Sequence, residues 1–389
     1  MPAPSTRIAT LTDGGDDGWG IFRRARALKA AGHAVLELTI GEHDIGTAPE
    51  ILDEMHRAAQ AGATGYASTQ GIGPLRAAVA ERLTARHGTP YTPDNILIVP
   101  GAQAGLFAAH HAACDEGARA LMIDPYYTTY PGTIRAVGAR PVAVAARSED
   151  GFQPDLAALA AAAPGARSLL INSPNNPTGA VYSQASLDGI ARIAEDHDLW
   201  VIADEVYDTQ IWAGAHIPFA ALPGMAARTL TVGSMSKSHA MTGSRLGWVA
   251  GPAEAIGCLA SLATHTTYGV PGYIQEAGLF ALRQGAAMEA EVAAPFLRRR
   301  QMVLDRVAEQ NLVRAIPPDG AMYVMLDIRA TGLSGDAFAE RLLEETGVAV
   351  MPGESFGTAA AGHLRVALTL PDAIFDSAVS QLIGFAQRC

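Results

Sequence analysis

The stretch TVGSMSKSHAMTGSRLGW, residues 231–248, contains Lys237, one of only two lysines in this chain of 389 residues. An apolar run typical of a buried strand precedes Lys237, and Ser234 and Ser236 stand directly before it. A primary amine can lose its proton and attack an aldehyde, whereas a guanidinium stays protonated and is a poor nucleophile. Because arginine supplies almost all other positive charge, the retained lysine predicts a chemical use of its amine. A solvated surface lysine is the alternative interpretation.

Around this stretch, short apolar runs alternate with helix-like segments from about residue 95 onward. This alternation predicts an α/β fold with a mainly parallel sheet covered by helices on both faces. Helices are expected at 102–114, at 183–197 and in the alanine-rich segment before Pro164. The expected strands are NILIVP, ARALMIDP, ARPVAVAA, RSLLINSP, LWVIADEVY, RTLTVGSMSK and RLGWVAGP.

Beyond about residue 285 the pattern changes to a long charged helix, followed by strand, helix, strand and strand, which indicates a second, smaller α+β domain. A last helix is predicted from Pro371, with an apolar stripe of Ile374, Ala378, Leu382 and Phe385. We therefore divide the chain into an N-terminal arm with part of the small domain (1–45), a large ligand-binding domain (46–285) and a small C-terminal domain (286–389).

The composition favours a globular protein that binds small molecules. With 49% hydrophobic and 17% charged residues the chain can bury a large core, and its net charge of -11 works against binding nucleic acid or an anionic membrane. The three cysteines are far apart and have no histidines at ligand spacing, so neither disulfides nor a metal site are expected. The N-terminus lacks an apolar signal region, so we expect a soluble cytoplasmic protein.

Polar residues that follow the predicted strands should meet at one edge of the sheet, where ligands bind in such folds. Neither a dinucleotide fingerprint nor a Walker A loop is present, so the phosphate should belong to a smaller cofactor. Ordinary turn chemistry is the alternative interpretation of each signal taken alone. The groups that together suit a dianionic phosphate are the backbone amides of Gly101, Ala102 and Gln103, the hydroxyls of Ser234 and Ser236, and the guanidinium of Arg245.

Pyridoxal 5'-phosphate is the phosphate-bearing aldehyde that fits this combination. Its ring nitrogen needs a carboxylate in order to stay protonated, and Asp204 at the end of VIADEVY can supply one. A buried aspartate without a partner would be costly, so it requires such a neighbour. Taken alone, Asp204 would more often be a cap or turn former and Asn176 a turn residue.

These residues resemble those of class I aminotransferases, which are fold type I pyridoxal-phosphate enzymes, over residues 5–389. The resemblance implies a large domain with a mainly parallel sheet, a smaller α+β C-terminal domain and a homodimer. The motifs that carry it are SMSKSHAMTGSRLGW, NSPNNPTG, ADEVY, TIGEHD, GYASTQGIGPLR and GHLRVAL.

The resemblance also implies a role for each matching residue. Lys237 would bond to the cofactor aldehyde and later move the substrate proton, with Asp204 and Tyr207 completing the catalytic set. Arg365 would clamp the substrate α-carboxylate beside Gly41 and Asn176, although a salt-bridged surface arginine is the alternative for Arg365. The implied cofactor contacts are Asp204 to the ring nitrogen, Asn176 and Tyr207 to the ring hydroxyl, Tyr127 on the ring face, and Ser234, Ser236, Arg245, residues 101–103 and Tyr66 of a neighbouring subunit at the phosphate.

The implied activity is ping-pong transfer of an amino group from an amino acid to a 2-oxo acid, either pyruvate or 2-oxoglutarate. Finer runs such as SKSHAMTG and AAGHLRVAL are similar to bacterial arginine:pyruvate transaminases. Gln103 stands where aspartate-preferring relatives carry lysine, and His43 and Ser244 replace a common proline and tryptophan. Glu42 and Asp44 could suit a basic side chain, with solvated loop charges as the alternative.

Two rival functions stay open at this point. The same cofactor chemistry could expel a β-substituent, as in a carbon–sulfur β-lyase. A fold of this kind could also be a non-catalytic effector-sensing domain, but such regulators carry a DNA-binding module, for which the sequence before residue 46 leaves too little room. The sequence does not determine the amino donor or acceptor, because specificity depends on side chains from both subunits.

Overall fold

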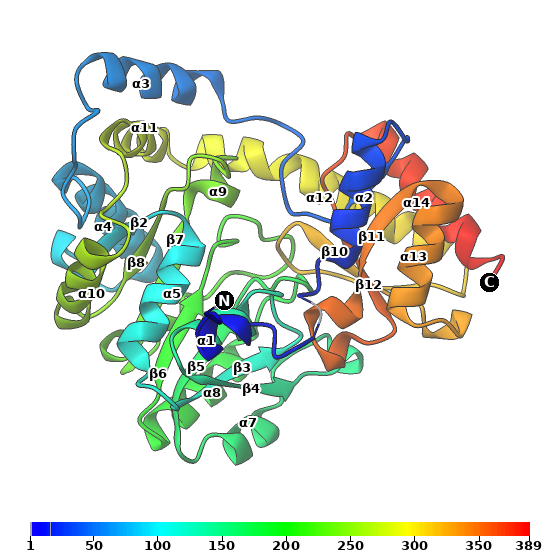
Figure 1. Cartoon of the computed structure of the whole chain (residues 1–389), viewed down its shortest axis with the longest axis horizontal. Coiled ribbons are helices and arrows are strands. Elements are labelled where there is room, and N and C mark those ends of the chain that lie inside the picture. Colours follow the sequence, from blue (N-terminus) through cyan, green and yellow to red (C-terminus); the bar gives the residue numbers. More distant parts are fainter. Residues whose placement is uncertain (1, 16) are drawn as a thin grey trace.

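The computed structural model describes residues 2–15 and 17–389, which contain a seven-stranded sheet and a five-stranded sheet lying side by side (Figure 1). In the larger sheet only β8 runs against its neighbours, so the mainly parallel sheet expected from the sequence is confirmed. Its strands, in spatial order, are β2 (Ile96–Val99), β8 (Gly247–Ala250), β7 (Thr229–Ser234), β6 (Trp200–Asp204), β5 (Ala166–Asn172), β3 (Arg119–Asp124) and β4 (Arg140–Ala145).

Helices cover both faces of this sheet because its strands are apolar on both sides. In β2, Leu97 and Val99 join one buried cluster with α5 and α10, while Ile96 and Ile98 join another with α4 and α11. In the helix expected at 183–197, the apolar residues Leu187, Ile190, Ile193 and Ala194 are buried in a third cluster against β5 and β6. The covering helices are α4 (Gly73–His87), α5 (Ala102–Ala113), α6 (Tyr130–Ala136), α7 (Leu156–Ala162), α8 (Gln184–Asp196), α10 (Ala253–His265) and α11 (Gly272–Arg283).

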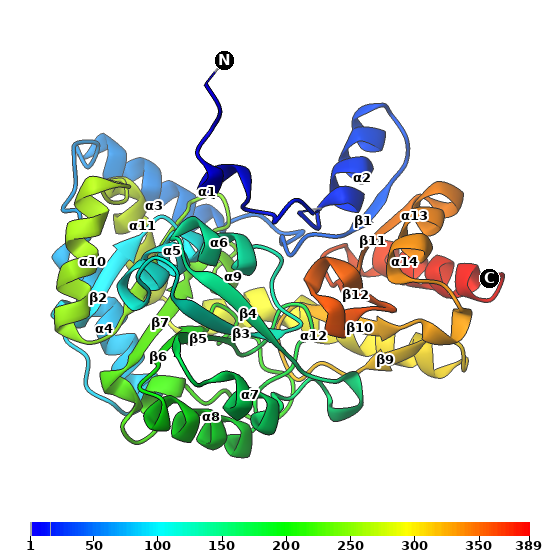
Figure 2. The same ribbon diagram turned by 60° about the horizontal axis from the view of Figure 1, so that its bottom comes forward.

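The second sheet joins the two ends of the chain, as Figure 2 shows in its blue and orange elements. β1, from the N-terminal arm, pairs in parallel with β11, so residues near 40 lie beside the C-terminal strands. This pairing agrees with placing the arm in the smaller unit, while the domain boundaries themselves stay a prediction. The strands, in spatial order, are β1 (Leu36–Leu38), β11 (Val348–Pro352), β12 (His363–Ala367), β10 (Tyr323–Asp327) and β9 (Arg314–Ile316).

Helices pack on this sheet around a buried cluster of its own. No helix of the described residues is long and apolar enough to cross a membrane. The helices of this part are α2 (Gly20–Ala30), α12 (Ala286–Ala308), α13 (Gly335–Thr346) and α14 (Asp372–Ala386), and the remaining ones are α1 (Thr6–Ala9), α3 (Pro49–Gln60) and the single turn α9 (Met235–Ser238).

One predicted core position is wrong. Ile374 of α14 has 45% of its surface exposed, while the other three residues of the predicted stripe are buried. Phe375 is buried in its place. Both residues stand one helical step before Ala378, so the rotation of α14 against its sheet decides which of them faces the core. Pro371 itself is the residue before the helix and not its first turn.

Candidate active site

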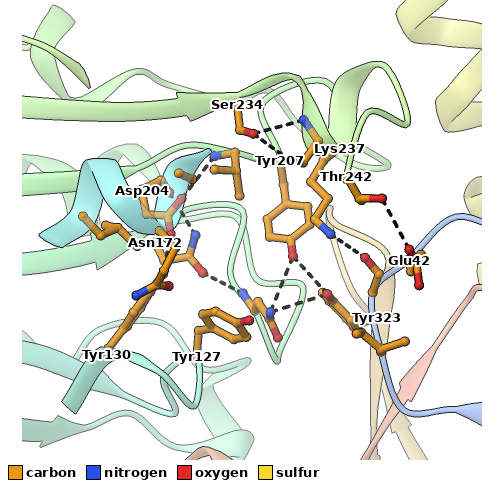
Figure 3. Close-up of a pocket in the computed structure, with 18 of the residues that line it drawn as sticks. Glu42, Tyr127, Tyr130, Asn172, Asp204, Tyr207, Ser234, Lys237, Thr242 and Tyr323 are labelled. Carbon is orange, nitrogen blue, oxygen red and sulfur yellow. Dashed lines mark hydrogen bonds between the residues drawn. The ribbon is translucent and has the colours of Figure 1, made fainter. Parts of the chain in front are cut away.

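A cavity of about 240 Å³ opens at the carboxyl ends of β2, β3, β5, β6 and β7, and residues of β10 and β12 complete its lining. Figure 3 shows side chains that line it, Lys237, Asp204 and Tyr207 among them. Its lining contains twelve of the fourteen residues that the sequence singled out. They are Gly41, Ala102, Gln103, Tyr127, Asn176, Asp204, Tyr207, Ser234, Ser236, Lys237, Arg245 and Arg365.

The two other predicted residues lie elsewhere. Gly101 lies next to the cavity, because a Cβ atom placed on it would be 2.3 Å from Nη2 of Arg245. Tyr66 does not line the cavity of its own chain. Its side chain is 93% exposed and packs edge-on against Tyr268, with 5.2 Å between the ring centroids.

Lys237 lies on the single turn α9, directly after β7, where Ser234 caps the turn by accepting a hydrogen bond from the Ser236 amide. The Lys237 amine donates a hydrogen bond to the carbonyl of Gly41, at the end of the segment that follows β1. Burial, and secondly the positive charge of Arg365, lower the pKa of Lys237 to about 8. An amine with this pKa is partly neutral near pH 7, which suits a nucleophile or a general base.

Asp204 ends β6 and is almost fully buried. The hydroxyl of Tyr130 donates to Oδ2 at 2.7 Å, and the backbone amide of Val206 donates to Oδ1 at 3.3 Å. Burial nevertheless raises the pKa of Asp204 to about 6, against these hydrogen bonds. A buried carboxylate in this state is stabilised by a positively charged partner, which a protonated ring nitrogen would supply.

Arg365 projects from β12 and is only 1% exposed. Its Nη1 donates to Oδ1 of Asn176 at 2.8 Å, its Nη2 donates to the Thr39 carbonyl, and its Nε has no partner among the described residues. The guanidinium carbon lies 4.4 Å from the ring centroids of both Tyr323 and Phe356. Because no carboxylate of the described chain pairs with it, the alternative of a salt-bridged surface arginine is wrong. A buried arginine without an acid is prepared for a carboxylate ligand.

Hydroxyl and amide groups form a network between Lys237 and Arg365. The hydroxyls of Tyr207 and Tyr323 lie 3.0 Å apart, and Nδ2 of Asn176 lies 3.5 Å from each of them. The side chain of Asn172 holds this loop in place, since its Oδ1 accepts the Asn176 amide at 2.8 Å. The network offers both donors and acceptors to a ring hydroxyl or a substrate group.

Hydrogen-bond donors of three kinds converge at the start of α5. Gly101 has a left-handed φ of +78°, and the amides of Ala102 and Gln103 have no acceptor in the part of the chain that the structure describes. The Ser234 hydroxyl donates to Ser236 at 2.9 Å. The guanidinium of Arg245 is held against Gly101 by a bond from Nη1 to the Thr242 carbonyl at 2.9 Å. Such a cradle suits a phosphate group.

Sequence reasoning missed several residues that shape the cavity. Tyr130 could have been found, since it follows Tyr127 by three residues in the run YYTTYP. Asn172, the last residue of a predicted strand, gave the same signal as the other strand ends. Tyr323 gave none, because only the pairing of β10 with β12 brings it beside Arg365.

The departures from the common motif have structural consequences. Nε2 of His43 lies 3.1 Å from the Lys237 carbonyl and donates to it, because a carbonyl oxygen can only accept. Burial lowers the pKa of His43 to about 3, so the ring is neutral. The Gln103 side chain is fixed by Thr133, to which it donates at 2.7 Å, and by Thr129, which donates to it at 2.9 Å. Ser244 does not line the cavity.

The chain was compared with known proteins. Residues 33–382 match the family model "Aminotransferase class I and II". An arginine–pyruvate transaminase of Pseudomonas aeruginosa is 41% identical over 353 residues, which are 90% of each chain. An aspartate/prephenate aminotransferase of Thermus thermophilus is 37% identical over 88% of this chain and 89% of that protein. A structure of Thermus thermophilus aspartate aminotransferase with maleate superimposes with a TM-score of 0.92 at 33% identity, covering 99% of this chain and all of that one.

Proposed function

This chain belongs to the class I and II aminotransferases, and we propose that it transfers the α-amino group of arginine, or of a similar cationic amino acid, to pyruvate. The observation that carries the proposal is one cavity in which the partly buried amine of Lys237, the buried carboxylate of Asp204 and the buried guanidinium of Arg365, which has no acidic partner among the described residues, face each other. These are the groups that amino transfer needs at the reacting atoms and at the substrate carboxylate.

Aminotransferases of this family use pyridoxal 5'-phosphate, and the residues of this cavity fit that group. The amine of Lys237 suits its aldehyde, the raised pKa of Asp204 suits a positively charged ring nitrogen, and Tyr207 and Asn176 suit its ring hydroxyl. Tyr127 lines the same space and suits the ring face. The phosphate would be held by Gly101, Ala102, Gln103, Ser234, Ser236 and Arg245. When bound, the cofactor withdraws electrons from the bonds at the substrate Cα.

Lys237 is proposed as the general base, with the substrate proton moving to and from its Nζ. A pKa of about 8 leaves the amine partly neutral at neutral pH, yet basic enough to accept a proton. The Gly41 carbonyl and His43, which bind the amine and the backbone carbonyl of Lys237, hold both ends of the residue. Tyr130 is proposed to favour the charged form of Asp204, because its hydroxyl donates a hydrogen bond to the carboxylate.

Arg365 is proposed to bind the substrate α-carboxylate, with Asn176 beside it. The side chain is already oriented by Asn176 and by the Thr39 carbonyl, and the rings of Tyr323 and Phe356 flank it, so little ordering is required when the substrate binds. Fixing the carboxylate fixes the direction of the Cα–H bond relative to Lys237.

Gln103 supports a donor other than aspartate. A second substrate carboxylate needs a cationic partner, but Gln103 is neutral and its amide is engaged by Thr129 and Thr133. The relative named as an arginine–pyruvate transaminase is also more similar in sequence than the aspartate/prephenate aminotransferase described above.

A homodimer belongs to the proposal. Tyr66 and Tyr268 expose their rings together, and Thr264 donates to Thr69 at 3.2 Å, which joins the last turn of α10, just before Tyr268, to the segment that carries Tyr66. Two exposed aromatic side chains in contact are typical of a surface that a partner covers. We propose that Tyr66 reaches the phosphate in the second subunit. Loss of cofactor affinity in Tyr66→Phe, measured together with the mass in solution, tests this step.

The activity test follows the nitrogen atom. Protein loaded with pyridoxal 5'-phosphate is mixed with arginine labelled with ¹⁵N at the α-amino group and with pyruvate, and ¹⁵N-alanine is measured by mass spectrometry. We expect labelled alanine from the wild type and from Lys29→Arg, and none from Lys237→Ala. Release of ammonia and pyruvate from cystathionine without a 2-oxo acid would instead indicate a lyase, and label transfer by Lys237→Ala would contradict the assigned base.

A further inference from the structure

One ionisable side chain that lines the cavity has no role in the proposed function. Five acidic or basic side chains line it: Glu42, Asp204, Lys237, Arg245 and Arg365. The proposed function uses four of them, for the ring nitrogen, the reacting amine, the phosphate and the α-carboxylate. Glu42 is the remaining one, and it is the acidic group that the amino acid substrate itself could meet.

Glu42 and its neighbour Asp44 have different surroundings in the structure, a difference that the sequence alone does not show. Both oxygens of Asp44 are bound by Arg299 of α12, at 2.8 and 2.7 Å, and the Asp44 side chain is only 13% exposed. Asp44 is therefore neutralised within the fold. Glu42 is exposed, and the contact found for it among the described residues is a long hydrogen bond of 3.4 Å from the Thr242 hydroxyl. Its negative charge stays available to a ligand.

Glu42 also lies close to the reacting atoms. It directly follows Gly41, whose carbonyl binds the Lys237 amine, and its negative charge acts to raise the pKa of Lys237 against the stronger effects of burial and Arg365. Figure 3 shows Glu42 beside Thr242, on the Lys237 side of the cavity. The side chain attached to the substrate Cα would therefore start near the Glu42 carboxylate.

Apolar side chains line the same cavity. Trp19 packs edge-on against Tyr127, with 6.3 Å between ring centroids, and Ile40 precedes Gly41 on the segment that leads from β1. Methylene groups of a long side chain can bury against such a wall while the charged end reaches a carboxylate. A cavity with apolar walls and the Glu42 carboxylate suits a long cationic side chain better than a short or acidic one.

We propose that Glu42 selects the substrate side chain, by pairing its carboxylate with the guanidinium or ammonium end while Trp19 and Ile40 contact the methylene stem. The inference rests on the proposed function, since it assumes that Arg365 holds the α-carboxylate. It adds the residues that would recognise the long, positively charged side chain of the donor. A glutamine at position 42 would keep the size and lose the charge.

The test compares arginine with citrulline, which has the same length but a neutral end. We expect Glu42→Gln to lower kcat/KM for arginine about 10-fold and to leave citrulline unchanged within about twofold. Glu50→Gln, at an exposed carboxylate in the first turn of α3, is the matched control and should change neither substrate.

A binding measurement gives a readout that is independent of turnover. 5-Guanidinopentanoate and 5-ureidopentanoate lack the α-amino group and so bind without reacting. Calorimetry should show about 10-fold weaker binding of the guanidino acid to Glu42→Gln and unchanged binding of the ureido acid. The same titration also reports whether the variant is folded, because the ureido acid still binds through Arg365.

Each other outcome decides against the inference in a distinguishable way. Equal loss for arginine and citrulline would mean that Glu42 acts through the Lys237 amine and not on the side chain. No loss for either would place the cation elsewhere. If the wild type uses other amino acids but neither arginine nor lysine, the donor class of the proposed function is wrong and the inference fails with it. Turnover of no amino acid at all would overturn the proposed function itself.

Discussion

The amine of Lys237 should titrate far below an ordinary lysine, and this can be measured on the protein without cofactor. Burial and the charge of Arg365 lower its pKa from 10.5 to about 8. At pH 7 about a tenth of such amines are neutral, which is about 300-fold more than for an unperturbed lysine. The neutral fraction sets the rate of attack on an aldehyde or an acylating reagent.

The assay is competitive labelling with a trace of an acylating reagent between pH 6 and 11, followed by mass spectrometry of the two lysine peptides. Lys29, whose side chain is 54% exposed, reports the intrinsic behaviour of the reagent. Because access to a buried amine is restricted, the informative quantity is the pH at which the rate levels off. We expect a midpoint near 8 for Lys237.

Two substitutions test the direction in which neighbouring charges shift the pKa of Lys237. Arg365→Met removes a positive charge and should move the midpoint of Lys237 upward, whereas Glu42→Gln removes a negative charge and should move it downward. A labelling rate at Lys237 of the wild type that still rises at pH 10 would contradict the lowered pKa, because the amine would then be solvated and protonated at neutral pH.

Three further predictions concern the cofactor cradle, the buried carboxylate and the clamp. Gly101→Ala should weaken cofactor binding by roughly 10- to 100-fold, because its Cβ would lie 2.3 Å from Nη2 of Arg245; Gly285→Ala, with a similar φ of +73° but open space around it, is the control in the same fluorescence titration. The folded protein holds the Asp204 proton more tightly than the unfolded chain, so the unfolding free energy of the cofactor-free protein should fall by about 3 kcal/mol as the pH rises from about 3 to 7. Asp204→Asn should lose that fall, and an unfolding free energy, measured by urea denaturation, that depends on pH equally in the wild type and in Asp204→Asn would contradict the raised pKa. Arg365→Lys should reduce kcat/KM at least about 10-fold, mainly through KM, since an ammonium does not form the paired contact of a guanidinium with a carboxylate; steady-state kinetics that match the wild type would remove Arg365 from the substrate site.

The strand ends were predictable because their signal is local. In a parallel strand the apolar run and the polar residue that follows it are adjacent in sequence, and all such ends meet at one edge of the sheet. This is why Lys237, Asp204 and Asn176 could be placed together before any coordinates were known. The reversed direction of β8 was not visible in the same pattern, since an apolar run looks alike in either direction.

The parts that escaped prediction depend on distant pairings. Asp44 and Glu42 are two residues apart and equivalent in sequence, and only Arg299, 255 residues further along the chain from Asp44, distinguishes them. Tyr323 meets Arg365 through the register of two antiparallel strands. Ile374 and Phe375 are both apolar, so the rotation of α14 against its sheet decides which of them is buried.

We propose that Lys237 is the residue that bonds to the cofactor aldehyde, and because the chain has only two lysines, the attachment site can be measured directly. The protein is loaded with pyridoxal 5'-phosphate, reduced with borohydride to fix any bond between amine and aldehyde, and digested for peptide mass spectrometry. We expect one phosphopyridoxyl group per chain, on Lys237. A group found on Lys29 instead, or no group retained on the 231–248 segment, would contradict it.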